Sequence, residues 1–390
     1  MEIILALIML LLSNAGAMED VSLQYLQAAA AELKTSETET PRTDENVGTD
    51  EWIKRDPQAG EAPVIRGIFA TAHSAGGSKL NALLQLIDDT ELNAIVIDVK
   101  DDHGNITYET GNAELESFGT TRKIIRDIDS LMNTLEQHEV YPIARIVVFK
   151  DTVLAKQKPE WSFLESNGSV WINNRKEAFV NPYVKEVWDY NIEVAKEAVK
   201  AGFKEIQFDY VRFPEGFETR ADRLKYSTLE NYDREDIVTE FVKYAREQLN
   251  PLGVRVSVDI FGYAASAPAS GIGQDFNGIS KYVDVISPMI YPSHYGPGWF
   301  GSPVPDAAPY TTIYGAAVDT DKKLEESDQY KPIIRPWIQD FTASWIPGYI
   351  PYGKEEVEAQ IRALKDTGIE EFLLWNASNV YTEGVNYTLE

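Results

Sequence analysis

Two aspartates in the middle of the chain could supply the paired carboxyl groups that acid–base chemistry requires. Asp209 ends the stretch Lys204–Asp209, and Asp259 lies near the end of Val254–Ile260. Apolar and polar residues alternate in both stretches, which is typical of a β-strand with two unlike faces. We therefore predict two neighbouring strands, about 4.8 Å apart, whose aspartates face a common hollow. Carboxyl groups about 5 Å apart would suit hydrolysis of a glycosidic bond with retention of configuration.

Close carboxylates repel each other, and this repulsion would keep one of them protonated near neutral pH as a general acid. Arg212 stands close enough in sequence to hold the other carboxylate ionised, or to bind a substrate hydroxyl. Asp340 follows another predicted strand and is the alternative second carboxylate, at the wider separation that inverting enzymes use. The catalytic candidates are therefore Asp209, Asp259 and Asp340.

Further polar and aromatic residues lie near predicted strand ends or in the loops that follow. The loops 150–182 and 291–309 are long and contain several aromatic side chains, on which the apolar face of a sugar ring could stack. The alternative is that these aromatic residues only pack the loops against the rest of the protein. The candidate substrate-binding residues are Asp98, Lys100, Arg212, Tyr291, Trp299, Trp337 and Asn376.

The elements that must position these residues are short apolar strands alternating with amphipathic helices from residue 62 onward. This order is typical of repeated βα units with a parallel sheet. Eight strands with helices between them predict a closed (β/α)8 TIM barrel. A doubly wound sheet is the alternative, but inward-facing charges are harder to place in it. The predicted strands are 64–70, 93–99, 141–149, 204–209, 254–260, 283–287, 331–339 and 370–375.

Two other groups of charged residues have mainly structural interpretations. Strand alternation predicts that four charged side chains face the barrel interior: Arg145, Glu205, Arg255 and Arg335. Buried charges persist only when they are paired. We predict an internal ion network with Glu205 as the counter-ion. The segment 98–104 is acidic and contains a histidine, but it lacks the spacing of a calcium loop. A turn at its glycine is the prediction, and a metal-dependent hydrolase using Asp98, Asp101 and His103 is a weaker alternative.

Composition excludes several classes of function. The chain has 390 residues, a formal charge of −26 and no cysteine. The negative charge argues against nucleic-acid binding, because phosphates require neutralisation by Lys and Arg. The absence of cysteine excludes disulfides, thiolate metal sites and cysteine nucleophiles. No P-loop, HExxH motif or strand-linked GxGxxG is present, so we predict neither an organic cofactor nor a metal.

The N-terminus predicts export. Residues 3–12 are apolar, and Ala15-Gly16-Ala17 offers a cleavage site, although the basic start of a signal peptide is missing. We predict a signal peptide or uncleaved anchor at 1–17, a flexible acidic linker at 18–61 and a catalytic domain at 62–390. The protein would then be secreted or extracytoplasmic, with association to a membrane or cell wall through its N-terminus.

Five segments of the chain match a known family. They are Arg66-Gly-Ile-Phe-Ala-Thr-Ala72, Val96-Ile-Asp-Val-Lys-Asp-Asp-His-Gly104, Phe208-Asp-Tyr-Val-Arg-Phe-Pro214, Val258-Asp-Ile-Phe-Gly262 and Ser287-Pro-Met-Ile-Tyr-Pro292. They resemble a bacterial family of glycoside hydrolase-like domains catalogued as DUF4015, over about 63–379. The resemblance implies a TIM barrel related to amylase-like barrels, with Asp209 as the nucleophile. Strand five ends in Asp259 where amylase-like barrels have a glutamate, which leaves the acid role open between Asp259, Asp340 and Glu215.

The functional hypothesis is therefore an exported glycosidase that acts on a polysaccharide or oligosaccharide with two carboxyl groups. The alternative is a non-catalytic carbohydrate-binding barrel at the cell surface, which explains the aromatic loops equally well. Fold analogy alone does not decide between these two.

Overall fold

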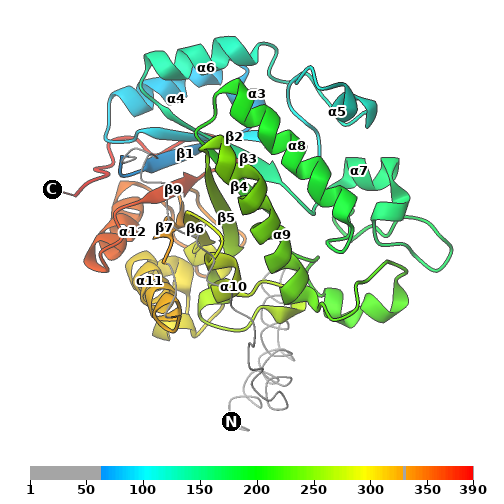
Figure 1. The fold of residues 1–390 in the computed structure, drawn as a ribbon. Coiled ribbons are helices and arrows are strands. Elements are labelled where there is room, and N and C mark those ends of the chain that lie inside the picture. The colour runs from blue at the N-terminus through cyan, green and yellow to red at the C-terminus, as the bar shows by residue number, and fades with distance from the viewer. Residues whose placement is uncertain (1–62, 328–330, 390) are drawn as a thin grey trace, which may run out of the picture.

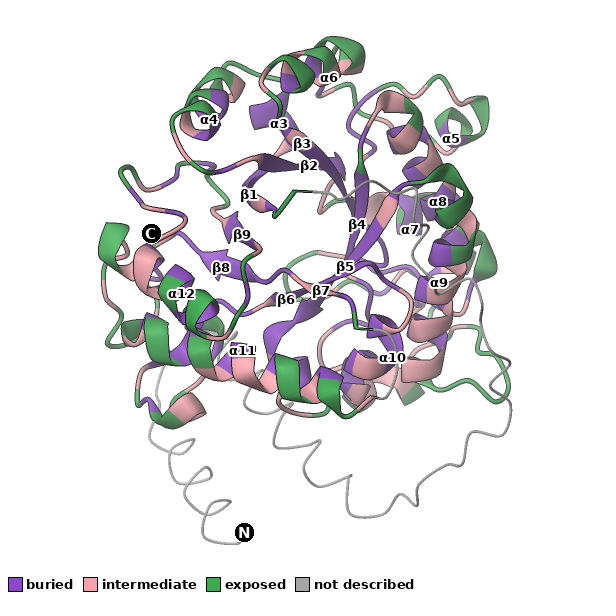
Figure 2. Cartoon of the chain, turned by 60° about the vertical axis from the view of Figure 1, so that its left-hand side comes forward, coloured by how far each residue is buried: buried purple, intermediate pink, exposed green. Residues whose placement is uncertain are grey.

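A closed ring of parallel strands forms the centre of the protein (Figures 1 and 2). The computed structural model describes residues 63–327 and 331–389. The predicted signal segment and linker lie outside these residues and remain predictions. The strands are β1 (Arg66–Ala70), β2 (Ala94–Lys100), β3 (Tyr141–Val147), β4 (Glu205–Asp209), β5 (Arg255–Phe261), β6 (Val285–Met289), β7 (Ile333–Ile334), β8 (Trp337–Gln339) and β9 (Phe372–Trp375).

The ring closes because β1 pairs with β9 and β5 pairs with β6, all in parallel. The short strands β7 and β8 share one position between β6 and β9. Arg335 and Pro336 separate them, and proline has no N–H to donate to a neighbouring strand. The predicted eight-position (β/α)8 barrel is thus confirmed, with its seventh strand in two pieces.

Helices cover the outside of the ring, as the amphipathic patterns predict. The main helices are α4 (Lys79–Asp88), α6 (Ile128–Gln137), α8 (Lys185–Ala201), α9 (Arg234–Leu249), α11 (Pro309–Glu325) and α12 (Lys354–Asp366). A one-turn helix, α10 (Phe276–Ser280), follows β5. Three more short helices were not predicted from the sequence: α3 (Ala72–Ala75), α5 (Ala113–Ser117) and α7 (Thr152–Gln157). No helix of the described residues is long and apolar enough to cross a bilayer.

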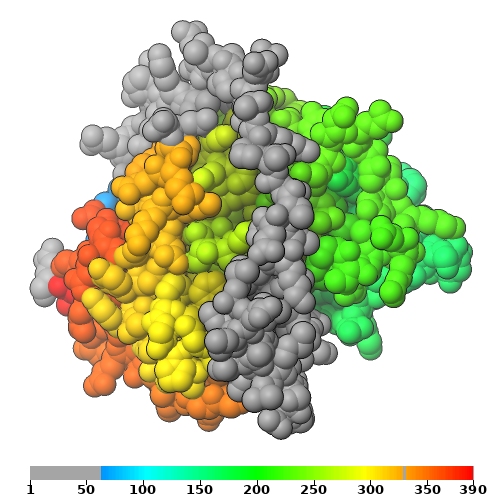
Figure 3. Space-filling view, turned by 90° about the horizontal axis from the view of Figure 1, so that it is seen from below, coloured from blue at the N-terminus to red at the C-terminus, as the bar shows by residue number. Residues whose placement is uncertain are grey.

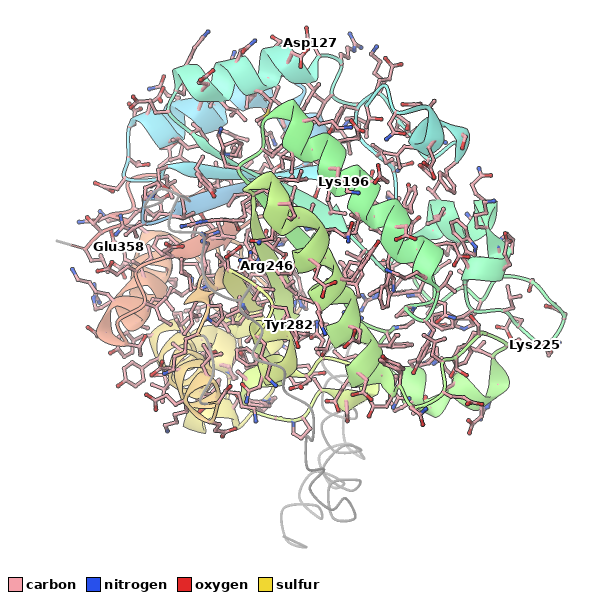
Figure 4. All side chains as sticks on the ribbon, viewed as in Figure 1. Asp127, Lys196, Lys225, Arg246, Tyr282 and Glu358 are labelled. Atoms are coloured by element: carbon pink, nitrogen blue, oxygen red, sulfur yellow. The ribbon has the colours of Figure 1, made fainter. Side chains whose placement is uncertain are left out.

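A buried ion pair fixes α9 to the ring. Arg246 of α9, labelled in Figure 4, pairs with Asp284 just before β6, and the same carboxylate accepts a hydrogen bond from the Val256 backbone N–H.

Figure 3 shows the protein from below. The yellow and orange part of the chain, which includes α11, forms one side of this view, and the green part, from α8 onward, forms the other.

Alternation along the strands divides the core into two layers. Ile206 and Phe208 belong to the large apolar layer between sheet and helices. A smaller apolar cluster fills the barrel interior with residues such as Phe69, Ile143 and Trp337. The charged inward side chains lie toward the two ends of the barrel, and between them the buried Gln207 donates to Ser287 at 3.4 Å.

The N-terminal end of the barrel contains part of the predicted ion network. Arg335 lies 2.7 Å from Glu205 and 2.7 Å from Glu371, and the Arg335 and Glu205 side chains are completely buried. Glu205 is therefore the counter-ion that the sequence predicts. Arg145 was expected to join this network, and that expectation was wrong, because its side chain lies at the opposite end of the barrel.

Candidate active site

A cavity of about 350 Å³ opens at the carboxyl ends of the strands. Asp209 at the end of β4 and Asp259 in β5 both line it. Phe208 and Val258 pair across these neighbouring strands, so the two aspartates stand at the same level of the barrel. The predicted arrangement of two carboxyl groups facing one hollow is what the structure contains.

Arg145 of β3 holds one of these carboxylates. Its Nε and Nη2 atoms donate to Oδ2 of Asp209 at 3.0 and 2.6 Å. The backbone N–H of Tyr210 donates to Oδ1 at 2.6 Å. Charge-assisted bonds of this kind stabilise an ionised carboxylate and fix its orientation. Both carboxylate oxygens of Asp209 are therefore oriented by the protein.

Asp259 has a different environment. Its side chain is buried, and its Oδ1 accepts a hydrogen bond from Nε1 of Trp337 at 2.7 Å. Burial raises the pKa of Asp259 well above its ordinary value, and the negative charge of Asp209 raises it further. The Trp337 hydrogen bond and the charge of Arg145 act in the opposite direction but are smaller effects. The surroundings of Asp259 thus favour its protonated form.

Two more aspartates surround Arg145. Its Nη1 donates to Asp98 at 2.6 Å, and its Nη2 lies 3.3 Å from Asp102. Burial raises the pKa of Asp98 to about 7, although Arg145 opposes this shift. Burial would also raise the pKa of Asp102, but the charges of Arg145 and Lys150 hold it below its usual range. Asp98 lies behind Arg145 rather than on the cavity wall.

The backbone is strained immediately after the nucleophile candidate. Tyr210 has φ 52°, in the left-handed region that non-glycine residues rarely adopt. The conformation brings its N–H to Asp209, and the Nζ atom of Lys150 lies 3.8 Å from its ring centroid. Strain of this kind persists only where surrounding contacts enforce it, and it gathers at functional sites.

Aromatic side chains form much of the cavity wall. Trp375 stacks on Phe69 at 4.2 Å between ring centroids, with an interplanar angle of 18°. Trp345 lies at the edge, remains 53% exposed and is nearly parallel to Phe341. An exposed indole at the rim of a polar pocket is suited to stacking on a flat ligand. The aromatic lining residues are Tyr210, Phe261, Tyr291, Tyr295, Trp337, Trp345 and Trp375.

Of the predicted substrate-binding residues, Arg212, Tyr291 and Trp337 line the cavity. Arg212 donates to Glu215 at 3.0 Å and to the Phe213 carbonyl, and its guanidinium lies over the Tyr210 and Phe261 rings. Burial and the nearby carboxylates raise the pKa of Tyr291 far above its usual range, which keeps its hydroxyl protonated as a donor.

Lys100 does not reach the cavity. The pairing of β2 with β3 shifts register between Asp98 and Lys100. This bulge turns the lysine to the outer side of the ring, where it contacts Asp151 at 2.7 Å and Asn191 of α8 at 2.9 Å. The predicted inward orientation was wrong because strict alternation ends at a bulge.

Asp340 and Asn376 were also placed incorrectly by the sequence analysis. Asp340 accepts hydrogen bonds from the hydroxyl and N–H of Thr382 at 2.5 and 3.0 Å, so its carboxylate faces the C-terminal segment. Asn376 donates to the carbonyls of Asp340 and Val380 at 2.5 and 2.7 Å. Both residues fix the final turns of the chain, and neither lines the cavity.

The aromatic residues of the two long loops mostly pack those loops. Trp299 contacts the rings of Tyr295 and Phe300, with centroids 5.4 and 5.6 Å away, and does not line the cavity. Trp161 packs against Phe118. Tyr295 is the aromatic residue of these loops, other than Tyr291 itself, that reaches the cavity. Trp299 therefore packs its loop, as the alternative interpretation of the aromatic loop residues predicts.

The acidic segment after β2 forms the predicted turn. Oδ1 of Asp101 accepts the backbone N–H groups of His103 and Asn105, both at 2.9 Å. Gly104 has φ 95°, and a Cβ atom at this position would collide with Asp151. In the part of the chain that the structure describes, no three or more His, Asp or Glu side chains are grouped to hold a metal ion.

Several residues of the site were not found by sequence reasoning. Arg145 was assigned to the structural network, although its inward phase was recognised. Trp375 occupies the inward phase of the last strand, two residues after Leu373 of the inner cluster, and this phase could have indicated it. Trp345 and Arg175 lie in loops, where no periodic signal exists. Only the folded chain brings them to the cavity.

Comparisons with known proteins agree with this architecture. A family model described as "Putative glycosyl hydrolase domain" (DUF4015) matches residues 67–381. No curated protein matches the chain. A hypothetical protein from Ruminiclostridium thermocellum is 37% identical, with a TM-score of 0.45, covering 49% of this chain and 96% of its own.

More distant solved structures also resemble the chain. An α-galactosidase from Thermus thermophilus, in complex with p-nitrophenyl α-D-galactopyranoside, is 10% identical with a TM-score of 0.50. The match covers 83% of this chain and 60% of the α-galactosidase, so less than two thirds of that protein is represented. The spore cortex-lytic enzyme SleL from Bacillus cereus is 11% identical with a TM-score of 0.47, covering 94% of this chain and 83% of that enzyme. At these identities the likeness concerns the fold.

Proposed function

Because the chain belongs to the DUF4015 family of glycosyl hydrolase domains, we propose that it is a glycosidase that cleaves a polysaccharide or oligosaccharide with Asp209 and Asp259. The observation that carries this proposal is the unlike environment of two neighbouring carboxyl groups. Arg145 pairs with Asp209, whereas burial beside Asp209 raises the pKa of Asp259. A glycosidase needs one ionised and one protonated carboxyl group, and we assign these states to Asp209 and Asp259 respectively.

The roles follow from these states. Asp259 gives its proton to the glycosidic oxygen as the bond to the leaving sugar breaks, and an oxygen of Asp209 attacks the anomeric carbon. A glycosyl ester of Asp209 and a free hydroxyl on the leaving sugar result. Asp259, now ionised, removes a proton from water, which attacks the anomeric carbon and releases Asp209. Retention of configuration is proposed because the aspartates lie on adjacent strands, about 4.8 Å apart.

Release of reducing sugar from a panel of polysaccharides by the full chain tests this proposal. The expected result is product from at least one polysaccharide, with the anomeric configuration of the substrate retained in the first product. Binding without release from any member of the panel would favour the alternative of a non-catalytic carbohydrate-binding barrel. The same aromatic cavity would serve that alternative.

Trp345→Ala should weaken substrate use without changing the chemical step. The indole is 53% exposed at the cavity edge, where it can stack on a sugar some distance from the carboxyl groups. A stacking contact is worth about 1 kcal/mol, so KM should rise about fivefold while kcat stays near the wild-type value. Kinetics on a polysaccharide substrate measure both constants, and Trp161→Ala, which alters an aromatic residue outside the cavity, is the control.

Trp337→Phe should shift the pH profile. The Nε1–H group of Trp337 stabilises the ionised form of Asp259, so its loss should raise the pKa of that carboxyl further. The basic limb of kcat/KM should therefore move to higher pH, and kcat should fall about tenfold because the acid loses its orientation. An unchanged basic limb would show that Trp337 does not act through Asp259.

A further inference from the structure

A second group of ionisable residues lies on the cavity wall, apart from Asp209 and Asp259. It consists of Arg175, Arg212, Glu215 and His294, which come from the loops after β3, β4 and β6. Glu215 accepts from Nη2 of Arg212 at 3.0 Å through Oε1, and its Oε2 lies 3.8 Å from Nη2 of Arg175. A single carboxylate thus stands between two guanidinium groups.

The charge of Arg175 is only weakly compensated. Its side chain is 50% exposed, and its ion pair within the described residues is the long contact to Glu215. His294 contributes no charge near neutral pH, because burial lowers its pKa to about 4 despite the smaller opposing effect of Glu215. Within this group, two guanidinium groups face one carboxylate, so this part of the cavity wall carries an excess positive charge in a chain whose net charge is −26.

A compact turn presents this arginine. Oδ1 of Asn173 accepts the backbone N–H groups of Arg175 and Glu177, both at 2.9 Å. Glu177 in turn lies 3.7 Å from Lys150, which contacts Asp102 at 2.8 Å. The turn is thereby fixed to the charged residues at the ends of the barrel strands, so Arg175 faces the cavity from a defined position.

The remaining carboxyl groups of the cavity leave this charge available. Asp209 lies 2.6 Å from Arg145, Asp102 contacts both Arg145 and Lys150, and burial raises the pKa of Asp259. A planar guanidinium binds a carboxylate through two parallel hydrogen bonds, so Arg175 has the geometry to replace its long contact with a close one.

We propose that Arg175 binds a carboxylate of the glycan, so that the substrate is an acidic polysaccharide built from uronic acid or another carboxylated sugar. This inference rests on the proposed glycosidase function and assigns its substrate class. The carboxylated sugar occupies the side of the cavity formed by the loops after β3 and β6. It lies next to the glycosidic bond that Asp209 attacks.

Affinity electrophoresis tests the proposal in the full chain carrying Asp209→Asn, which prevents cleavage. Native gels contain polygalacturonate, alginate or hyaluronate, and parallel gels contain the same polysaccharides after reduction of their carboxyl groups to alcohols. The expected result is that at least one acidic polysaccharide binds about tenfold or more tightly than its reduced form, as loss of a charge-assisted hydrogen bond implies. Dextran sulfate and dextran distinguish a sulfate from a carboxylate.

Arg175→Gln should remove the preference for the acidic polysaccharide, and Arg175→Lys should keep part of it. Arg122→Gln, an exposed arginine away from the cavity, is the matched control and should change nothing. The proposal is overturned if no carboxylated polysaccharide binds, if acidic and reduced forms bind equally, if dextran sulfate is preferred, or if the preference survives in Arg175→Gln. Release of sugar from a neutral polysaccharide by the wild-type chain would then leave the glycosidase function intact.

Discussion

Replacement of Asp259 by Asn should abolish most activity on natural glycans and spare activity on substrates with a good leaving group. Asn has the size of Asp but carries no transferable proton, so the glycosidic oxygen leaves without acid assistance. The expected loss is about 10²- to 10⁴-fold in kcat/KM on a polysaccharide. An aryl glycoside whose phenolate leaves unaided should be cleaved in its first step at close to the wild-type rate.

The pH profile provides a second readout for the same variant. Burial and the neighbouring Asp209 raise the pKa of Asp259, and the protonated form is the active one. Wild-type kcat/KM should therefore fall as pH rises through the pKa of Asp259, and this basic limb should be absent in Asp259→Asn. Equal losses on the polysaccharide and on the aryl glycoside would contradict the acid role.

Asp340→Asn is the matched control for this experiment. Asp340 is also a buried aspartate at the end of a barrel strand, but it contacts Thr382 and lies outside the cavity. The variant can lose stability, yet its ratio of activities on the two substrates should equal that of the wild type. A changed ratio would restore Asp340 as the candidate acid.

Replacement of Asp209 by Asn should eliminate turnover on every substrate, including activated ones. The single amide oxygen can accept from Arg145 or from the Tyr210 N–H, but not from both, so some stability should be lost. The amide is also a poor nucleophile. We expect kcat to fall by about 10⁴-fold or more, as when a nucleophile is removed from other enzymes. Initial rates and thermal unfolding curves measure the two effects separately.

Binding separates a catalytic role for Asp209 from a structural one. The variant should still bind the polysaccharide with nearly the wild-type Kd, since the aromatic wall and Arg212 are unchanged. Asp129→Asn makes the same substitution on the exposed surface of α6. It is the control for purification and storage of a variant protein, and it should keep full activity. Full turnover in Asp209→Asn would contradict the proposed nucleophile.

The barrel and its two central aspartates could be predicted from the sequence because both follow from periodicity. Alternation in 204–209 and 254–260 fixes which side chains face inward, and the structure places Asp209 and Asp259 accordingly. The same reasoning failed at Lys100, where a bulge in β2 reverses the phase. Alternation cannot reveal a bulge, because its cause lies in the pairing with β3 and in the buried carboxylate of Asp151.

Contacts between distant parts of the chain account for the other differences. The inward phase of Arg145 was recognised, but its partner depends on how far a long side chain extends along the barrel, toward Glu205 or toward Asp209. Asp340 was misplaced because the segment around Thr382 returns to cover it. Trp299 and Trp345 are both loop tryptophans, and tertiary packing alone decides that one supports a loop and the other faces the cavity.

Trapping of the covalent intermediate tests the central claim most directly. A 2-deoxy-2-fluoro glycosyl fluoride of the sugar that the wild-type chain releases should form the glycosyl ester with loss of fluoride, and the ester should hydrolyse slowly. The labelled peptide can then be identified by mass spectrometry. The account predicts one added sugar on the peptide containing Asp209 and none on the peptide containing Asp259. A label on another residue, or release of sugar with inverted configuration and no label, would contradict it.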